Sequence, residues 1–418
     1  MKKVIFVNRY FHPDQSATSQ ILTDLAKGLA ARGFDVHIVC SRQLYDEPAA
    51  RLVHDEMLFG VHVHRVATTR FGRSRLPGRT VDYASFYLSC TLKLLRLVCR
   101  GDVLVAKTDP PLMSILAAPI AHAKRAALIN WQQDVFPEVA SQLGANPLPD
   151  WLDRLLKRVR DASLRKAKVN VLIGERMREY LAGRGIPSSK LCVIENWANA
   201  DAIQPKPTAA STLRARLGLA NRFVVCYSGN MGRAHEFETL LAAAHALKET
   251  SSFVFLIIGS GAKMDALKGA VTESALDNFL FLPYQPHESL EDSLAAADVH
   301  LVSLLPALEG LIVPSKLYGI LAAGRPLIFI GDADGEVSRV IHRARCGRVV
   351  GVRDAKSLVD LLRSFAADFN GRVEMGARAR EILRKEFSLE HAIKRWAALI
   401  ESAHADAAEA TRGQARAG

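Results

Sequence analysis

The chain has 418 residues, of which 49% are hydrophobic and 23% are charged. This length suits two domains better than one, and the apolar content excludes an intrinsically disordered chain. The formal net charge of +12 favours an anionic partner, which could be nucleic acid, an acidic membrane surface or a phosphorylated substrate.

The cysteines and the apolar runs indicate a reducing, cytoplasmic setting. None of the six cysteines forms a CxxC pair, so we expect small core residues rather than disulfides or a zinc site. The first apolar run ends at Asn8 and is too short for a signal peptide. No run approaches the roughly 20 apolar residues of a membrane-spanning helix.

Strand candidates alternate with helical patterns in the first half of the chain, as in an α/β fold with a parallel sheet. A strand at 3–8 precedes a helix at 16–32, which Gly33 ends. Further strands are expected at 35–40, 61–66, 103–107, 127–132, 169–173 and 191–194.

The pattern restarts after Pro205-Lys206-Pro207. Residues 223–227 form an apolar run typical of a strand buried on both faces. Further strands are expected at 253–258, 279–282, 299–304, 326–330 and 348–352. We therefore predict two doubly wound, Rossmann-like domains at 1–205 and 206–386, a last helix at 387–402 and a disordered tail at 403–418.

The loop after the first strand is polar and stands before the amino terminus of a helix. In open α/β sheets, ligands bind beyond the carboxyl ends of the strands. The side chains of Tyr10, His12, Ser16 and Thr18 could therefore meet an anionic or hydroxyl-rich ligand. The alternative is a turn in which Asp14 or Ser16 caps the helix, although this leaves Tyr10 and His12 unexplained.

A second loop of the first domain, after the strand at 127–132, carries two carboxylates. Asp134 and Glu138 could act as acid, base or acceptors for sugar hydroxyls. In the alternative interpretation, Asp134 only caps a helix.

In the second domain, glycine-rich loops follow the first two strands. Gly229 and Gly232 would let a ligand approach the backbone around Asn230, and Arg233 could fork onto phosphate oxygens. The alternative is a glycine turn with a solvated arginine. Gly259-Ser260-Gly261 and the Tyr284-Gln285 turn are weaker signals, because each could be a tight turn only.

The segment 309–326 carries the strongest single signal. Pro314 and Ser315 open a helix and Gly324 closes it, with Lys316 in the first turn. The helix dipole disfavours a cation at this end, so Lys316 indicates a bound anion.

The sequence predicts no metal ligands. Asp332-Ala333-Asp334 is more typical of a turn or helix cap than of a DxD metal motif. The thirteen histidines show no convincing ligand spacing, and His62 and His64 alternate along a strand as surface residues do.

Two basic segments contain interleaved apolar residues. Residues 65–100 hold eight basic residues with only Asp82 as an acid, and 151–168 hold seven against Asp153 and Asp161. Such faces suit an anionic bilayer surface, although two solvated helix faces would have the same composition.

Several stretches together resemble the retaining glycosyltransferases of family 4, which have the GT-B fold of two facing domains. The resemblance spans nearly the whole chain and is closest to the branch that builds exopolysaccharide, O-antigen and colanic acid. It rests on NRYFHPDQSATS, QDVFPE, VIENWANADAI, YSGNMGR and VPSKLYGILAAGRPLIFIGDADGE.

The resemblance implies that a nucleotide-diphosphate sugar (UDP- or GDP-linked) binds to the second domain. Its implied catalytic residues are Asp134, Arg233 and Lys316, the two cations neutralising the diphosphate without a metal or other cofactor. The implied donor-binding residues are Gly229, Asn230, Gly232, Tyr284, Gln285, Glu309 and Ser315. The implied acceptor-side residues are Tyr10, His12, Ser16, Thr18 and Glu138.

The same resemblance implies retention of anomeric configuration and a polyprenyl-diphosphate-linked acceptor at the inner face of the cytoplasmic membrane. It also implies that the last helix returns to the first domain.

The chain departs from the family pattern at three positions. The two family glutamates would fall at Leu311 and Gly319, so Glu309 or Glu336 would have to replace them. Gln133 stands where the family often has histidine.

Three other functions remain open from the sequence. A UDP-sugar 2-epimerase would share the two domains, and a non-catalytic nucleotide-sugar-binding protein would explain the missing glutamates. Nucleic-acid binding is suggested by charge alone, without any helix-turn-helix, RNP or zinc pattern.

Overall fold

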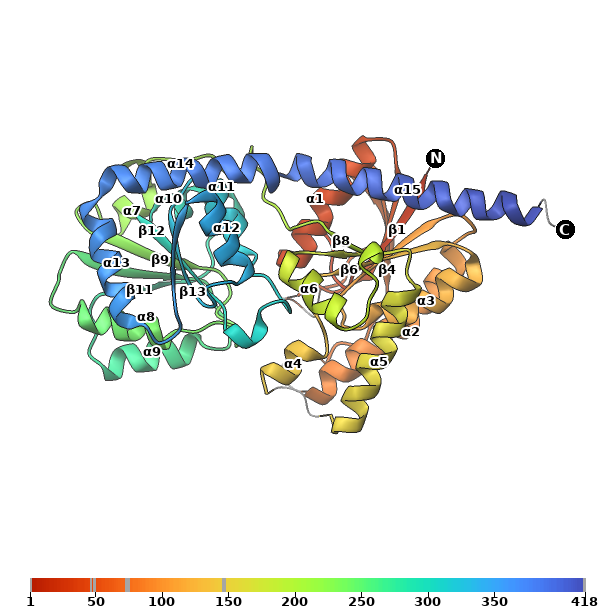
Figure 1. Cartoon of the computed structure of the whole chain (residues 1–418), viewed down its shortest axis with the longest axis horizontal. Coiled ribbons are helices and arrows are strands. Elements are labelled where there is room, and N and C mark those ends of the chain that lie inside the picture. The colour runs from red at the N-terminus through yellow and green to blue at the C-terminus, as the bar shows by residue number, and fades with distance from the viewer. Residues whose placement is uncertain (1, 46, 48–49, 72–75, 145–147, 416–418) are drawn as a thin grey trace. The chain divides into compact units, whose positions relative to one another are not determined.

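The computed structural model describes residues 2–45, 47, 50–71, 76–144 and 148–415 (Figure 1). The chain forms two compact units. Unit 1 comprises 1–195 together with 389–418, and unit 2 comprises 196–388.

Unit 1 is built on an eight-stranded sheet of order β3-β4-β2-β1-β5-β6-β7-β8. Every pairing is parallel except that of β3 with β4. The short, polar edge strand β3 carries no apolar run and was not expected from the sequence. The strands are β1 (Lys3–Val7), β2 (Asp35–Ser41), β3 (Asp55–Leu58), β4 (Val61–Val66), β5 (Val103–Lys107), β6 (Ala127–Gln132), β7 (Val169–Leu172) and β8 (Leu191–Val193).

Helices cover both faces of this sheet. On one face, Phe86 and Leu94 of α2 pack with Val39 and Leu104 of the strands. On the other face, the fully buried Trp396 of α15 contacts Trp131, with ring centroids 4.7 Å apart. The helices are α1 (Ala17–Ala31), α2 (Leu76–Leu97), α3 (Met113–Lys124), α4 (Glu138–Gln142), α5 (Asp150–Lys166), α6 (Glu175–Gly183) and α15 (Leu389–Ala415).

The last helix thus belongs to unit 1, and it is longer than the sequence suggests. α15 continues through Ala415, whereas a disordered tail is expected from 403. The alanine-rich composition of that stretch favours helix more strongly than its polarity opposes it.

Unit 2 contains a six-stranded parallel sheet of order β11-β10-β9-β12-β13-β14. Its strands are β9 (Phe223–Ser228), β10 (Phe253–Ile258), β11 (Phe279–Leu282), β12 (Val299–Ser303), β13 (Leu327–Ile330) and β14 (Gly347–Val350). Its helices are α7 (Thr212–Arg216), α8 (Glu238–Ala246), α9 (Met264–Glu273), α10 (Leu290–Ala295), α11 (Lys316–Ala322), α12 (Glu336–Ala344), α13 (Ala355–Ala367) and α14 (Phe369–Glu386).

The boundary between the units lies ten residues before the one expected at 205. Arg380 of α14 explains the difference, because its guanidinium donates to the carbonyl oxygens of Ala200 at 2.5 Å and Ile203 at 2.7 Å. These bonds attach 196–205 to unit 2. No helix in the described part of the chain is both long and apolar enough to cross a membrane.

Each sheet reverses its strand order once. In unit 1 the reversal lies between β1 and β5, and in unit 2 between β9 and β12. Loops at such switch points are where open α/β sheets bind ligands.

Candidate functional site

The glycine loops after β9 and β10 pack backbone against backbone in unit 2. A Cβ on Gly259 would lie 2.2 Å from the carbonyl oxygen of Gly229, and both residues have positive φ, 134° and 130°. The amide of Met231 donates to the carbonyl of Ser260 at 2.8 Å. The Gly259-Ser260-Gly261 turn therefore serves to place the Gly229 loop.

Lys316 lies against this loop. Its Nζ is 3.5 Å from the centroid of the Tyr227 ring and 3.4 Å from the carbonyl oxygen of Asn230. Its Cε would be 3.4 Å from a Cβ on Gly229. The structure thus brings together Lys316, Gly229 and Asn230. Burial holds the pKa of Lys316 well below its usual value, so a bound anion would stabilise its charged form.

Arg233 projects from the same loop into solvent. The next residue, Ala234, accepts a hydrogen bond from the amide of Leu305 at 2.9 Å, which joins the loops that follow β9 and β12. Arg233 therefore stands at the switch point of unit 2, where its guanidinium is available to a ligand.

Of three further predicted donor-side residues, Tyr284 and Gln285 lie in the loop after β11, and Ser315 is the N-cap residue of α11. Tyr284 is 54% exposed, and the Gln285 side chain donates to the carbonyl of Pro283 at 2.9 Å. Ser315 is exposed directly before Lys316.

Glu309 has a structural contact. Its Oε2 accepts a hydrogen bond at 3.1 Å from the amide of Glu336, the first residue of α12. The same carboxylate fills the space beside Gly335, where a Cβ would clash at 2.3 Å. Glu309 thus stabilises the start of α12.

The positions of the missing family glutamates differ in their surroundings. Leu311 is 3% exposed and belongs to the core. Around Gly319, the nearest atom outside its own helix to a Cβ would be Leu294 Cδ1 at 3.9 Å, which leaves room for a side chain.

In unit 1, Asp14 organises the loop after β1. Its Oδ1 accepts from the amide of Ser16 at 2.9 Å, and its Oδ2 accepts from the amide of Tyr45 at 2.5 Å. The Ser16 hydroxyl also donates to Asp14. Tyr10 is 2% exposed and packs edge-on against Tyr45, with ring centroids 5.6 Å apart. Asp14 and Tyr10 therefore stabilise the loop.

His12 is half-buried in the same loop and packs edge-on against Phe59 at 5.2 Å. Burial, together with the charges of Lys27 and Arg65, lowers the pKa of His12. Its imidazole is therefore neutral at neutral pH and can accept or donate a hydrogen bond.

Lys107 is buried at the end of β5, beside the switch point. Its Nζ donates to the carbonyl oxygen of Thr18 at 2.6 Å and lies 4.3 Å from the Trp131 ring centroid. Burial lowers the pKa of Lys107 to about 7, although the carboxylates of Asp109 and Asp134 oppose the shift.

Asp134 follows the neighbouring strand β6 and lines one pocket with Lys107, Thr108 and Gln132. The residue is exposed at the surface, but burial of its carboxyl group by the surrounding protein and the charge of Asp109 raise the pKa of Asp134 to about 6. Two groups with pKa values near neutrality in one pocket are typical of proton-handling sites.

The sequence predicts Asp134 and Thr18 but not Lys107. A lysine that ends the apolar run Val103–Lys107, at the strand next to β1, is the signal that would have found it. The backbone amide of Gln133, at the position of the family histidine, donates a hydrogen bond to Thr108 Oγ1 at 3.1 Å.

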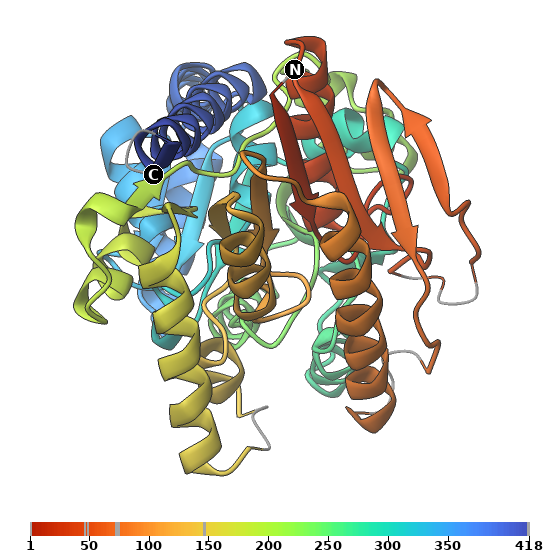
Figure 2. The same ribbon diagram turned by 90° about the vertical axis from the view of Figure 1, so that its right-hand side faces the viewer.

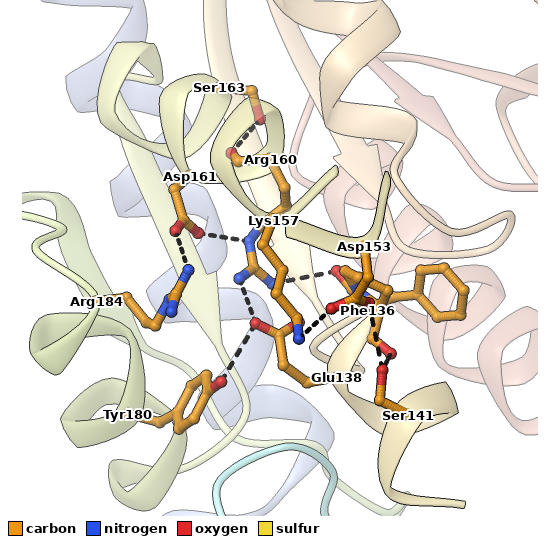
Figure 3. A network of polar contacts seen from close by, with 11 residues as sticks. Phe136, Glu138, Ser141, Asp153, Lys157, Arg160, Asp161, Ser163, Tyr180 and Arg184 are labelled. Carbon is orange, nitrogen blue, oxygen red and sulfur yellow. Dashed lines mark hydrogen bonds and ion pairs between the residues drawn. The ribbon is translucent and has the colours of Figure 1, made fainter. Parts of the chain in front are cut away.

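Glu138 lies in a buried network of ion pairs (Figure 3). Both of its oxygens accept from Arg160, at 2.7 and 3.1 Å, and the hydroxyl of Tyr180 donates to Oε1 at 3.2 Å. Asp161 bridges Arg160 and Arg184. Arg160 also donates to the carbonyl of Phe136 at 3.1 Å, so the network supports the loop that carries Asp134.

Comparisons with known proteins give the family of both units. The family described as "Glycosyl transferase 4-like domain" matches residues 17–197, and "Glycosyl transferases group 1" matches 210–382. The chain belongs to the family-4 glycosyltransferases. It is 27% identical over 333 residues to the probable glycosyltransferase WbjE of Pseudomonas aeruginosa, covering 79% of this chain and 82% of WbjE.

A second relative is the putative colanic acid biosynthesis glycosyl transferase WcaI of Escherichia coli K12, 28% identical over 170 residues. That match covers 40% of this chain and 42% of WcaI.

Solved structures confirm the GT-B fold. Sucrose-phosphate synthase from Thermosynechococcus elongatus superposes with a TM-score of 0.76 at 18% identity, covering 97% of this chain and all of that one. HepE of Anabaena in complex with UDP gives 0.71 at 15% identity, covering 96% of this chain and all of HepE. This glycosyltransferase thus has the expected fold.

Proposed function

We propose that this glycosyltransferase moves a sugar from a nucleotide-diphosphate donor to a polyprenyl-diphosphate-linked saccharide during synthesis of a bacterial surface polysaccharide. The position of Lys316 beside the glycine loop of unit 2 is the main support for a nucleotide-diphosphate donor. The name of WcaI, a putative colanic acid biosynthesis glycosyl transferase, supports a polysaccharide pathway, and the HepE complexes with UDP and UDP-glucose support a nucleotide-sugar donor.

In the proposed reaction, the bond between the anomeric carbon and the diphosphate oxygen breaks. Lys316 and Arg233 stabilise the charge that develops on the departing diphosphate, so no metal ion is required. The acceptor hydroxyl attacks from the same face, and its proton passes to the carboxylate of Asp134. Configuration is therefore retained, and product NMR would contradict this step by showing inversion.

The donor proposal can be tested by thermal unfolding with UDP, GDP, ADP and dTDP. One nucleotide should stabilise the protein, by about 2.7 kcal/mol at a hundredfold excess over Kd. Lys316→Ala should abolish this shift, and Lys356→Ala, an exposed lysine of the same unit, should retain it. The proposed donor site is wrong if no nucleotide binds or if both variants behave alike.

The lipid-linked acceptor places the protein at the inner face of the cytoplasmic membrane, and α5 supports this. Its outer side exposes Trp151, Leu155 and Val159, by 62%, 46% and 38%. The exposed basic side chains of Arg154 and Arg158 lie between them. This pattern suits the boundary between anionic headgroups and acyl chains.

Helix α2 has a similar outer stripe. Val81, Leu88, Leu92 and Leu95 are 42–65% exposed and recur at helical spacing. α3 lies between α2 and α5 and contacts both, so the two stripes belong to one side of unit 1 (Figure 2).

Liposome flotation tests this contact. The protein should float with vesicles containing anionic lipid at low salt, and Trp151→Ser with Leu155→Ser should reduce the bound fraction severalfold. Phe369→Ser, at an equally exposed site in unit 2, is the matched control. Equal flotation of all three proteins would contradict membrane binding through α5.

A further inference from the structure

Three histidines lie side by side on β2 and β4 of the unit 1 sheet, next to its edge strand β3. His37 of β2 is the register partner of His62 of β4, and their rings lie 4.5 Å apart at an angle of 12°. His64, two residues further along β4, lies 5.3 Å from His37 at 13°.

Polar contacts join these rings to two carboxylates. Asp35 Oδ1 is 3.1 Å from His37 Nε2, and His37 Nδ1 is 3.0 Å from His64 Nε2. His64 Nδ1 is in turn 2.6 Å from Asp55 Oδ1. The result is a chain of three contacts with a carboxylate at each end.

The three polar contacts between Asp35, His37, His64 and Asp55 together lack one positive charge. Each of the three contacts needs a proton between two acceptors, but two neutral imidazoles supply only two protons. Lys93 Nζ, 3.1 Å from Asp55, partly neutralises that carboxylate but does not fill any of the three contacts. The missing charge must come from a third proton or from a metal ion.

The position of His62 distinguishes these two cases. Its Nε2 lies 3.7 Å from the same Asp35 oxygen that faces His37. A proton joins two atoms, whereas three ligand atoms converge here, all within 4.8 Å of one another.

We infer that Asp35, His37 and His62 bind a divalent transition-metal ion of the Zn²⁺ class. In a tetrahedral site with bonds of about 2.0–2.1 Å, ligand atoms lie roughly 3.3 Å apart. The two separations from Asp35 Oδ1, 3.1 Å to His37 Nε2 and 3.7 Å to His62 Nε2, bracket this value, and all three ligand atoms lie within 4.8 Å of one another. Since the His62 side chain is 43% exposed, water can supply the fourth ligand.

His64 and Asp55, which also take part in these contacts, complete the site. With the metal on His37 Nε2, His37 Nδ1–H donates to His64 Nε2, and His64 Nδ1–H donates to Asp55. The two imidazole protons then fill the two remaining contacts, His37 to His64 and His64 to Asp55. Second-shell bonds of this kind fix the tautomer and orientation of metal-ligating histidines.

The inferred site lies away from the candidate active site. Asp35 and His62 stand at the amino-terminal starts of β2 and β4, whereas Lys107 and Asp134 lie at or after the carboxyl ends of their strands. The ion would therefore join β2 to β4 and stabilise unit 1 without taking part in sugar transfer.

Metal titration of the tag-free full-length chain, after EDTA treatment, tests the inference. We expect one Zn²⁺ per chain by competition with a chromophoric chelator, and tetrahedral absorption bands with Co²⁺. His37→Gln and His62→Gln should each weaken Zn²⁺ binding more than about tenfold, and the second-shell His64→Gln by about 10- to 100-fold. The exposed His122→Gln of α3 should bind like the wild type.

Two results would overturn the inference. One is the absence of Zn²⁺ binding, or an affinity unchanged by both His37→Gln and His62→Gln. The other is a doubly protonated His37 in ¹⁵N NMR spectra at pH 7 that Zn²⁺ does not alter, which would assign the missing charge to a proton. Circular dichroism and the unfolding midpoint without metal show whether each variant is folded.

Discussion

The two units carry different chemistry at equivalent topological positions. In unit 2, Lys316 lies on a surface of glycine backbone and an aromatic ring, and Arg233 follows in the glycine loop. In unit 1, a lysine and a carboxylate share a pocket, and the pKa values of Lys107 and Asp134 are shifted to about 7 and about 6. The arrangement in unit 2 suits a ligand that carries a negative charge. The lysine and carboxylate of unit 1 suit proton exchange with a neutral hydroxyl group.

The largest expected effect is that of Lys316→Ala. Removing a charge that stabilises a leaving group costs about 10²–10³ in rate. We expect a loss of kcat/KM near the upper end, measured as nucleotide release from the donor sugar. Lys356→Ala should keep wild-type activity. Equal losses of kcat/KM in both variants would show that Lys316 has no special role in unit 2.

Glu138→Ala should mainly affect stability. It leaves the guanidinium of Arg160 buried without its carboxylate, and breaking a buried ion pair costs about 3–5 kcal/mol. Urea denaturation measures the loss, and Glu138→Gln should lose less because it still accepts hydrogen bonds. Unchanged stability with a raised acceptor KM would instead support Glu138 as an acceptor-binding residue.

Asp134→Asn tests proton exchange in unit 1. Because the pKa of Asp134 is raised to about 6, its carboxylate forms as the pH rises through 6, and wild-type activity should rise with it. The variant should lose about a hundredfold in kcat and the rise near pH 6. If the variant keeps the wild-type pH profile, Asp134 does not control it.

The smallest effect is expected at Gly319 in α11. A Cβ fits there, so Gly319→Ala should stabilise the protein by about 0.5–1 kcal/mol. Gly259→Ala should do the opposite, since its Cβ would overlap the carbonyl of Gly229. Unfolding midpoints of the two variants should therefore shift in opposite directions.

The sequence predicts the alternation of strands and helices well, because apolar runs mark buried strands directly. The run 223–227 corresponds to β9, and the helix expected at 16–32 corresponds to α1, Ala17–Ala31. The edge strand β3 lacks such a run, since Asp55 and Glu56 begin it. Its place in the sheet depends on pairing with β4.

The candidate site is predicted in part. Glycines after a strand and a lysine at a helix start locate Gly229 and Lys316 from local pattern alone. The bidentate pairing of Glu138 with Arg160, and the convergence of His37 with His62, depend on strand register and helix packing across more than 20 residues. Sequence spacing carries no signal for such contacts.

The order of synthesis gives the last helix a further significance. All of unit 2 emerges from the ribosome before Trp396, whose indole covers Phe6 and Trp131 in the core of unit 1. The part of the protein that is translated first is therefore completed last. Until then, nascent unit 1 exposes an apolar face that chaperones can bind, and a premature stop before residue 396 would leave that face uncovered permanently.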